Sequence, residues 1–234
     1  MENQGKRLNK FIADSGYCSR READRLISEG RVRVDGRVGV LGDRVEAGMS
    51  VTVDGRRLSG RGERVYLMLY KPAGIVCTAD PREPMNVVDY IHYPVRIFAV
   101  GRLDKDSEGL LLLTSDGEIV NRLLRAAGGH EKEYDVTVDR PVTAEFLKRM
   151  SEGVPILETV TLPCRVRRTG EKSFNIVLVQ GLNRQIRRMC EALGYSVRAL
   201  RRIRIMNLRL DGLRPGQWRE LTDEELRTLL AALD

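Results

Sequence analysis

A segment that carries three carboxylates lies between two apolar runs of the sequence. The acids are Asp104, Asp106 and Glu108, within residues 101–109. Apolar residues precede the segment and Leu110–Leu113 follow it, and both apolar runs predict buried strands. A loop anchored by core strands on both sides is a common place for a functional site. A carboxylate held there can act as a nucleophile or as a general acid or base.

Two other interpretations of this loop stay open on its residues alone. A charged surface turn has the same composition. A glycoside hydrolase could use two of the three acids. Acting on a nucleoside, it would release the free base and would not bond the base to the sugar again. A calcium loop of the EF-hand type does not fit, because the twelfth position counted from Asp104 is Ser115, where that loop needs a bidentate Glu.

The segment 181–194 contains a predicted helix, 184–193, with one apolar side and one cationic side. Arg184 and Arg188 point away from the apolar stripe and suit phosphate groups, and the positive end of the helix dipole adds to this. Arg187 lies at the edge of the stripe, where it can hold a buried carboxylate in its ionised form. The alternative is that all three arginines are surface residues. The apolar stripe consists of Ile186, Met189, Cys190 and Leu193.

Tyr134 lies at the start of a third segment of interest, the predicted strand 133–139, where it is the second residue. A single tyrosine in a strand usually packs in the core with its hydroxyl hydrogen-bonded. Beside a carboxylate and arginines, it could instead offer a face on which a nucleic-acid base stacks.

Several common catalytic arrangements are missing from the sequence. It contains no P-loop, no G-x-G-x-x-G and no G-x-S-x-G motif. Its two histidines are isolated and its four cysteines are widely spaced, which fits neither a zinc site nor a disulfide scaffold. We therefore expect no metal and no other cofactor. The remaining chemistry is that of a carboxylate with arginines and an aromatic residue.

The charge of the chain indicates a polyanionic partner. The 234 residues include 40 Lys and Arg against 33 Asp and Glu, a net charge of +7. Residues 184–209 contain eight arginines and one acid, and residues 6–37 contain nine basic and five acidic residues. Two basic segments on an otherwise mildly acidic chain predict a polyanion that is held at two places.

The sequence lacks the features of membrane insertion and secretion. Its longest aliphatic run, Leu229–Leu233, has five residues, and no apolar core follows the N-terminus. We expect a soluble, cytoplasmic protein that acts as a monomer and keeps its cysteines reduced.

The chain divides into two predicted domains. A small, mostly helical domain covers residues 6–58, a polar linker covers 59–64, and a second domain covers 65–234. In the second domain, several strands follow one another without a helix between them, which favours an α+β fold with a mixed or antiparallel central sheet flanked by helices. Its predicted strands are 65–70, 96–100, 110–114, 133–139, 174–179 and 203–210, and its predicted helices are 116–126, 143–152, 184–193 and 222–232.

The small domain shows clear local signals. Its second predicted helix opens with a capping box at Ser19 and Glu22. Arg21 and Arg25 share the side of this helix that lies opposite its apolar face. Two predicted strands, each running into an Asp-Gly turn, follow at 32–38 and 51–56.

Four motifs of the sequence belong together: Arg102-Leu103-Asp104 with the adjoining 106–110, Lys71–Gly74, Lys132 with Tyr134, and Gln185–Arg187. They occur in the order seen in RNA pseudouridine synthases of the RsuA-like branch, and the chain resembles this family along nearly its whole length. The small domain resembles the RNA-binding module first described in the small-subunit ribosomal protein S4. The runs most similar to enzymes of large-subunit ribosomal RNA are 130–134, 153–157, 179–191 and 204–207.

The resemblance implies an isomerase that converts a specific uridine of large-subunit ribosomal RNA, free or in an assembling particle, to pseudouridine without a cofactor. It implies that Asp104 is the nucleophile, that Arg187 is its charge partner, and that Tyr134 stacks on the base and assists proton movement. The uridine must be flipped out of its stack. The RNA contacts implied by the resemblance and by the two basic segments are Arg102, Leu103, Lys105, Arg184, Gln185, Ile186, Arg188, Arg21 and Arg25.

Two positions depart from the common pattern of the family. Tyr70 precedes the Lys-Pro pair where Asn is common, and Ser107 stands where many relatives have Thr. Neither position is the expected nucleophile. The alternative function is that of a non-catalytic RNA-binding protein that assists ribosome assembly. Such a protein would not need Asp104, whose charge repels phosphate.

Overall fold

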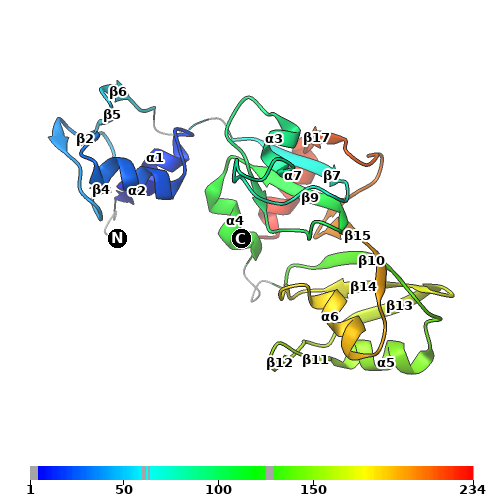
Figure 1. Ribbon diagram of the computed structural model, residues 1–234. Coiled ribbons are helices and arrows are strands. Elements are labelled where there is room, and N and C mark those ends of the chain that lie inside the picture. Colours follow the sequence, from blue (N-terminus) through cyan, green and yellow to red (C-terminus); the bar gives the residue numbers. More distant parts are fainter. Residues whose placement is uncertain (1–4, 60–61, 63, 125–128, 234) are drawn as a thin grey trace. The chain divides into compact units, whose positions relative to one another are not determined.

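The structure, a computed structural model, describes residues 5–59, 62, 64–124 and 129–233 (Figure 1). The chain divides into two compact units. The smaller unit consists of Met1–Val65, Tyr93–Ile97 and Ser115–Gly117, and the larger consists of Tyr66–His92, Phe98–Thr114 and Glu118–Asp234. Among the described residues, no helix has both the length and the apolar character needed to cross a membrane.

The smaller unit combines two helices with short antiparallel strands. Its helices are α1 (Leu8–Asp14) and α2 (Arg20–Ser28), and its strands are β1 (Lys6–Arg7), β2 (Val32–Val34), β3 (Arg37–Val38), β4 (Arg44–Val45), β5 (Val51–Val53) and β6 (Arg56–Arg57). Four strands form a sheet of order β3-β2-β5-β6, and β1 pairs with β4. Both helices and the sheet enclose one core, to which Leu8, Ile12, Leu26 and Val53 belong.

Local sequence explains why these elements begin and turn where they do. The Ser19 hydroxyl accepts a hydrogen bond of 3.1 Å from the Glu22 amide, and this caps α2 as predicted. The second half of the predicted capping box is not formed. The Glu22 carboxylate accepts a hydrogen bond of 2.5 Å from the guanidinium of Arg25, whereas in a capping box it would accept one from the backbone amide of Ser19. The pairs Asp35–Gly36 and Asp54–Gly55 have positive φ at both residues, as the predicted tight hairpins require.

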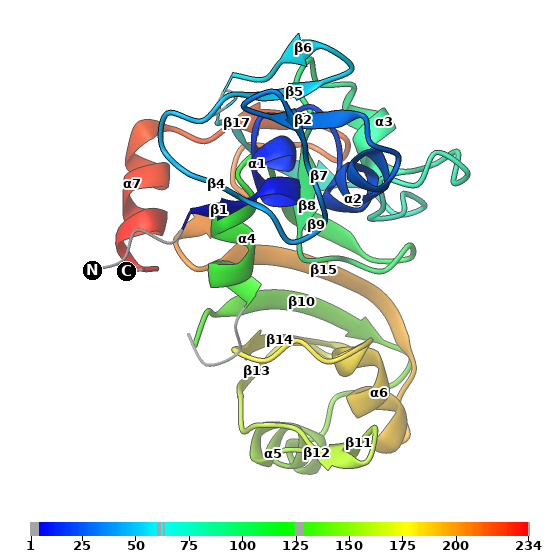
Figure 2. The same cartoon turned by 90° about the vertical axis from the view of Figure 1, so that its left-hand side faces the viewer.

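The larger unit is built on a nine-stranded sheet (Figure 2). Its strands are β7 (Tyr66–Lys71), β8 (Phe98–Val100), β9 (Glu108–Thr114), β10 (Lys132–Val138), β13 (Arg165–Gly170), β14 (Ser173–Leu178), β15 (Val197–Ile205), β16 (Leu208–Arg209) and β17 (Trp218–Glu220). The main order is β13-β14-β10-β15-β9-β7-β17, with β16 beside β15 and β8 beside β9. Strands β15 and β9 run parallel and the other paired strands run antiparallel, so the predicted mixed sheet is confirmed. A separate hairpin joins β11 (Pro155–Ile156) to β12 (Thr159–Val160).

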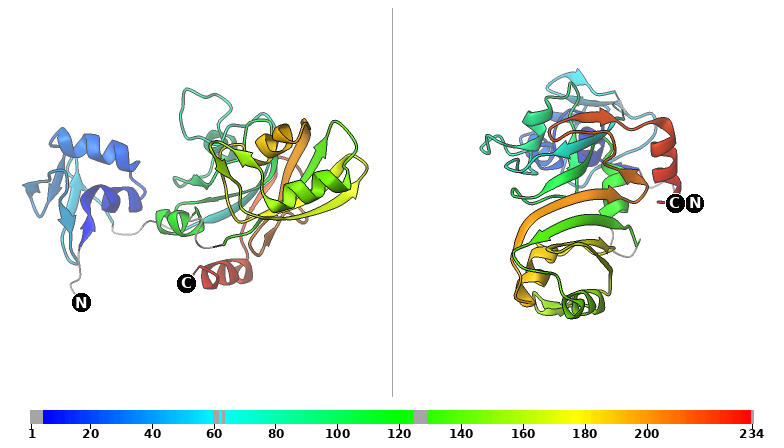
Figure 3. Two further views of the ribbon diagram at one scale, coloured as in Figure 1. Left: turned by 90° about the horizontal axis from the view of Figure 1, so that it is seen from below. Right: turned by 90° about the vertical axis from the view of Figure 1, so that its right-hand side faces the viewer.

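The helices of the larger unit pack against two halves of this sheet. They are α3 (Val87–Ile91), α4 (Gly117–Leu124), α5 (Ala144–Glu152), α6 (Gln185–Ala192) and α7 (Asp223–Ala231). Helices α5 and α6 lie against β10 and β14 (Figure 3). The core between them includes Phe146, Phe174 and Met189. Helices α4 and α7 pack on β7 and β9 in a second core that includes Ile119 and Leu229. The expected α+β fold, with helices flanking the sheet, is therefore confirmed.

The described elements differ from the predicted ones where local patterns are weak. Strand β15 starts at Val197, six residues before the predicted start, because pairing with β10 outweighs an arginine-rich sequence without clear alternation. The predicted strand 203–210 is broken by a turn at Met206, whose φ is +49°. Strand β13, strand β17 and the short helix α3 were not predicted. The last two positions of the predicted helix 116–126 lie outside the described residues.

Candidate active site

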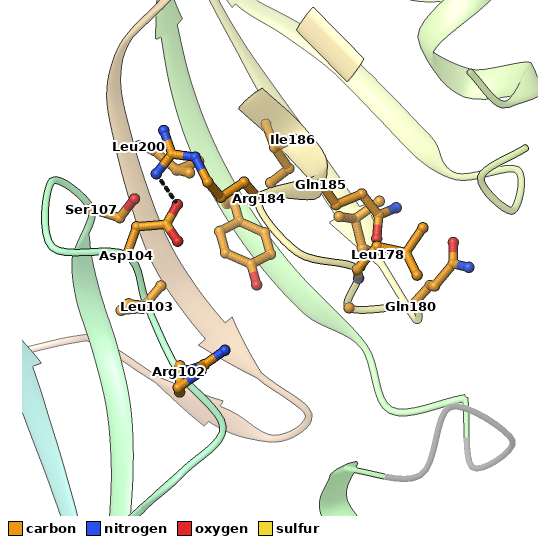
Figure 4. Close-up of a pocket in the computed structure, with 13 residues that line it drawn as sticks. Arg102, Leu103, Asp104, Ser107, Leu178, Gln180, Arg184, Gln185, Ile186 and Leu200 are labelled. Carbon is orange, nitrogen blue, oxygen red and sulfur yellow. Dashed lines mark hydrogen bonds and ion pairs between the residues drawn. The ribbon is translucent and has the colours of Figure 1, made fainter. Parts of the chain in front are cut away.

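The carboxylate loop joins β8 to β9 and forms one wall of a pocket in the larger unit. A turn closes within it, because the Ser107 amide donates a hydrogen bond of 3.1 Å to the Asp104 carbonyl. The opposite wall comes from β10, β14, β15 and the start of α6 (Figure 4). The pocket is lined by Arg102, Leu103, Asp104, Ser107, Tyr134, Leu178, Gln180, Gly181, Leu182, Arg184, Gln185, Ile186 and Leu200.

A buried lysine fixes the shape of the loop. The side chain of Lys71 is fully buried, and its Nζ donates to the carbonyls of Pro72 at 2.8 Å, Ser107 at 2.7 Å and Lys105 at 3.4 Å. The Gly74 amide also donates to the Lys105 carbonyl at 2.8 Å. Burial lowers the pKa of Lys71, and anionic groups around it oppose that shift. The 71–74 motif therefore supports the carboxylate loop. The sequence signal for this role was a lysine that ends an otherwise uncharged strand.

Asp104 lies between two guanidinium groups from the start of α6. Its Oδ2 is 3.2 Å from Nη1 of Arg184 and 3.5 Å from Nε of Arg187. Nη2 of Arg187 also donates to the Ser107 hydroxyl at 3.0 Å and to the Asp106 carbonyl at 3.3 Å. The Asp104 side chain is 28% exposed, so it is neither deep in the core nor free in bulk water. Two cations therefore face this half-buried carboxylate.

Tyr134 contributes an aromatic wall to the same pocket. It is half-buried on β10, where its neighbours across the sheet are Ile176 of β14 and Arg202 of β15. Leu178 and Leu200 line the pocket beside it. A planar ring between apolar side chains, across a pocket from a carboxylate, is suited to stacking on a base.

The structure places the other expected contact residues of this unit in different environments. Arg102 is exposed at the pocket wall, and Lys105 is exposed outside the lining residues. Gln185 is buried, and its Oε1 accepts a hydrogen bond of 3.0 Å from the Leu182 amide, so this side chain braces the loop before α6. Leu103 and Ile186 are buried in the pocket wall. Arg188 donates to the carbonyl of its neighbour Asn183 at 3.1 Å.

The two arginines expected to bind RNA in the smaller unit are also not equivalent. Arg21 and Arg25 are both exposed on α2. Arg25 is paired with Glu22 at 2.5 Å and with Glu29 at 3.6 Å. The cationic face predicted for α2 is therefore partly neutralised by acids of the same helix and its C-cap.

One residue near the site was not singled out by the sequence analysis. Arg202 is 3% exposed, and its Nε donates to the Leu110 carbonyl at 2.7 Å. Among the described residues, its buried Nη2 has no hydrogen-bond partner. Nothing in the sequence distinguishes it from the other arginines of 184–209. Among the residues that the structure describes, no three His, Cys, Asp or Glu side chains gather as a metal ion would need.

Comparison with known proteins identifies the class. Residues 65–192 match the RNA pseudouridylate synthase family, and residues 6–51 match the S4 domain. The first match covers more than half of the chain and contains every lining residue of the pocket described above except Leu200. The chain belongs to the RNA pseudouridylate synthase family, whose members isomerise uridine to pseudouridine. The expected isomerase class and the resemblance to this family are confirmed.

Similar proteins point to one type of enzyme within the family. The chain is 53% identical to the dual-specificity RNA pseudouridine synthase RluF of Salmonella typhi, over 97% of this chain and 80% of the relative. It is 52% identical to RluF of Escherichia coli, over 97% of this chain and 79% of the relative. It is 38% identical to the ribosomal large subunit pseudouridine synthase B of Bacillus subtilis, over 98% of this chain and 97% of the relative.

A solved structure supports the fold along the same length. A crystal structure of a pseudouridylate synthase matches 96% of this chain and 100% of its own, with a TM-score of 0.72 and 30% sequence identity.

Proposed function

We propose that this protein converts a uridine of large-subunit ribosomal RNA to pseudouridine. The observation that carries the proposal is the position of the Asp104 carboxylate, which lies between Arg184 and Arg187 in a pocket that also contains Tyr134. The RNA is inferred from relatives, since proteins 52–53% identical to the chain are RluF enzymes and a further relative is named for the large ribosomal subunit. Such a substrate implies action in the cytoplasm, and one chain holds all the residues of the pocket, as a monomer requires.

The reaction starts from a uridine flipped out of its stack. Asp104 attacks C1′ of the ribose, and the bond between C1′ and N1 of the base breaks. The freed uracil turns in the pocket against Tyr134, its C5 forms a bond to C1′, and the carboxylate leaves. The base loses the proton on C5 and gains one on N1. Because the product contains the same atoms and electrons as the substrate, no oxidant or energy source is required.

Arg187 assists these reaction steps through its positive charge. It is anchored by Ser107 and the Asp106 carbonyl, so its positive charge stays beside Asp104 while the carboxylate attacks and after it leaves. Flipping the uridine costs a few kcal/mol. Contacts of Arg102, Lys105, Arg184 and Arg188 with flanking phosphates offset part of that cost. Leu103, Gln185 and Ile186 shape the wall on which the nucleotide lies. In the smaller unit, Arg21 and Arg25 add phosphate contacts.

The direct test is an assay for pseudouridine in transcripts of large-subunit ribosomal RNA incubated with the purified protein. We expect product with the wild type and a loss of at least about a thousandfold with Asp104→Asn. Asp106→Asn is the matched control, because this exposed acid of the same loop lacks a contact between its carboxylate and Arg187.

Three results would contradict the proposal. Activity of Asp104→Asn equal to wild type would remove the assigned nucleophile. Binding of RNA without any product from the wild type would favour the non-catalytic assembly factor. Free uracil among the products would indicate glycosidic hydrolysis.

A further inference from the structure

Arg184 is the least expected feature of the pocket. Its backbone is left-handed, with φ of +50° and ψ of +35°, at the residue that precedes α6. Glycine and asparagine tolerate this conformation better than arginine does. A bulky residue held in an unfavourable conformation beside a site suggests that its side chain is used there.

The two arginines that touch Asp104 are held very differently. Arg187 is 15% exposed and is fixed by Ser107 and the Asp106 carbonyl. Arg184 is 42% exposed, and among the described residues its guanidinium has Asp104 as its sole polar partner, at 3.2 Å. Figure 4 shows the Arg184 side chain reaching across to Asp104 at the wall of the pocket. Arg187 is thus a built-in partner of the carboxylate, and Arg184 is a loosely held one.

We propose that Arg184 is a displaceable counterion, paired with Asp104 in the RNA-free enzyme and drawn away by a phosphate of the bound RNA. This inference rests on the proposed function and deepens it. When Arg184 leaves, one face of the carboxylate is uncovered for the ribose, and Arg187 remains as its cationic partner. The nucleophile is then fully available only when a charged backbone is in place.

The chemistry of the groups favours this exchange. A half-exposed ion pair between flexible side chains contributes little stability. A guanidinium forms two parallel hydrogen bonds with a phosphate, and these are strong and directional. Because α6 fixes the backbone of Arg184, only its side chain has to rotate. The substrate that this arrangement selects is a uridine within an intact anionic strand, and free uridine lacks the group that draws Arg184 away.

The first test measures binding and does not depend on catalysis. A labelled short single-stranded RNA that contains one uridine is titrated, at fixed salt, with wild type, Asp104→Asn, Arg184→Asn and the double variant. Asparagine is used at 184 because it accepts the left-handed backbone. If Asp104 competes with phosphate for Arg184, Asp104→Asn tightens binding about threefold or more, and most of this gain is lost in the Arg184→Asn background.

An equal gain in both backgrounds would overturn the proposal, because it would show simple repulsion between Asp104 and the RNA. Arg149→Gln, which removes an exposed cation of α5, controls for the loss of one positive charge.

The second test asks whether the phosphate acts on the chemical step. Single-turnover rates are compared for an RNA with normal linkages and for one with uncharged methylphosphonates on both sides of the uridine. We expect the uncharged linkages to slow the wild type and Arg184→Lys about tenfold more than they slow Arg184→Asn, in which no counterion has to be drawn away. The same relative loss in all three proteins would overturn the proposal. If the wild type forms no pseudouridine on either RNA, the proposed function fails, and the binding comparison still decides the role of Arg184.

Discussion

The two basic segments of the chain resemble each other in sequence and differ in what they offer to RNA. In residues 6–37, several arginines are already paired with acids of the same unit. Arg25 pairs with Glu22, Arg31 with Asp54, and Arg37 with Asp43. Much of the positive charge of this segment therefore serves the local structure of the small unit.

The arginines of residues 184–209 that form ion pairs fall into two groups. On β15, Arg201 pairs with Asp135 and Arg204 pairs with Glu131 and Glu133, so these arginines join strands of the sheet. At the start of α6, Arg184 and Arg187 surround Asp104. The comparison shows that the net charge of a segment does not measure the charge available to a ligand, because acids distant in sequence can neutralise it.

The largest effect expected within this comparison is on catalysis. Arg187→Gln should lower the single-turnover rate about a hundredfold or more, because the carboxylate loses its anchored cation. The exposed Arg198 of β15, in the same basic segment, is the matched control, and Arg198→Gln should stay close to the wild type. Similar losses in both variants would mean that the segment acts only through its total charge.

A smaller effect is expected on stability. Arg204 is 12% exposed and bonds Glu133 at 2.6 Å, so Arg204→Gln should lower the free energy of unfolding by about 2 kcal/mol. Arg165→Gln is the control, because Arg165 pairs with Glu131 but is 71% exposed, and its loss should cost no more than about 0.5 kcal/mol. Denaturant unfolding of the three proteins checks both values.

The cost of Arg204→Gln should also depend on pH. The hydrogen bond from Arg204 lowers the pKa of Glu133 in the folded protein. The stabilisation is therefore complete above the unfolded-state pKa of about 4.3 and is lost as pH falls through the folded value. The difference between wild type and variant should shrink in acid. A constant difference across that range would show that the ion pair is not its source.

The smallest effect concerns the small unit. Arg21→Gln should reduce the slope of log affinity against log salt by about one, as expected for the loss of one phosphate contact. Arg25→Gln should reduce it less, because Glu22 and Glu29 already neutralise Arg25. Salt titrations of RNA binding measure both slopes. Equal changes would show that the RNA breaks these ion pairs when it binds.

The parts of the fold with strong local signals could be predicted from the sequence. Asp-Gly hairpins, the Ser19 cap and the apolar strands β7 and β9 follow from turn chemistry, capping and hydrophobicity, which involve neighbouring residues. Strand β15 could not be predicted in full, because its arginines become strand residues only when β10 supplies hydrogen bonds and acids. The lysine at the end of β7 is visible in the sequence, but the carbonyls that its Nζ binds belong to Lys105 and Ser107, which are distant in the chain.

The sequence by itself determined the class of this protein and the segments that carry its chemistry, because motif order, charge and apolar pattern are written along the chain. Only the tertiary structure decided which charges are free. Asp104 and Arg184 are 80 positions apart in the chain and 3.2 Å apart in space, and no local rule connects them. An ion pair depends on distance and burial, and both are set when the sheet brings the loop and α6 together.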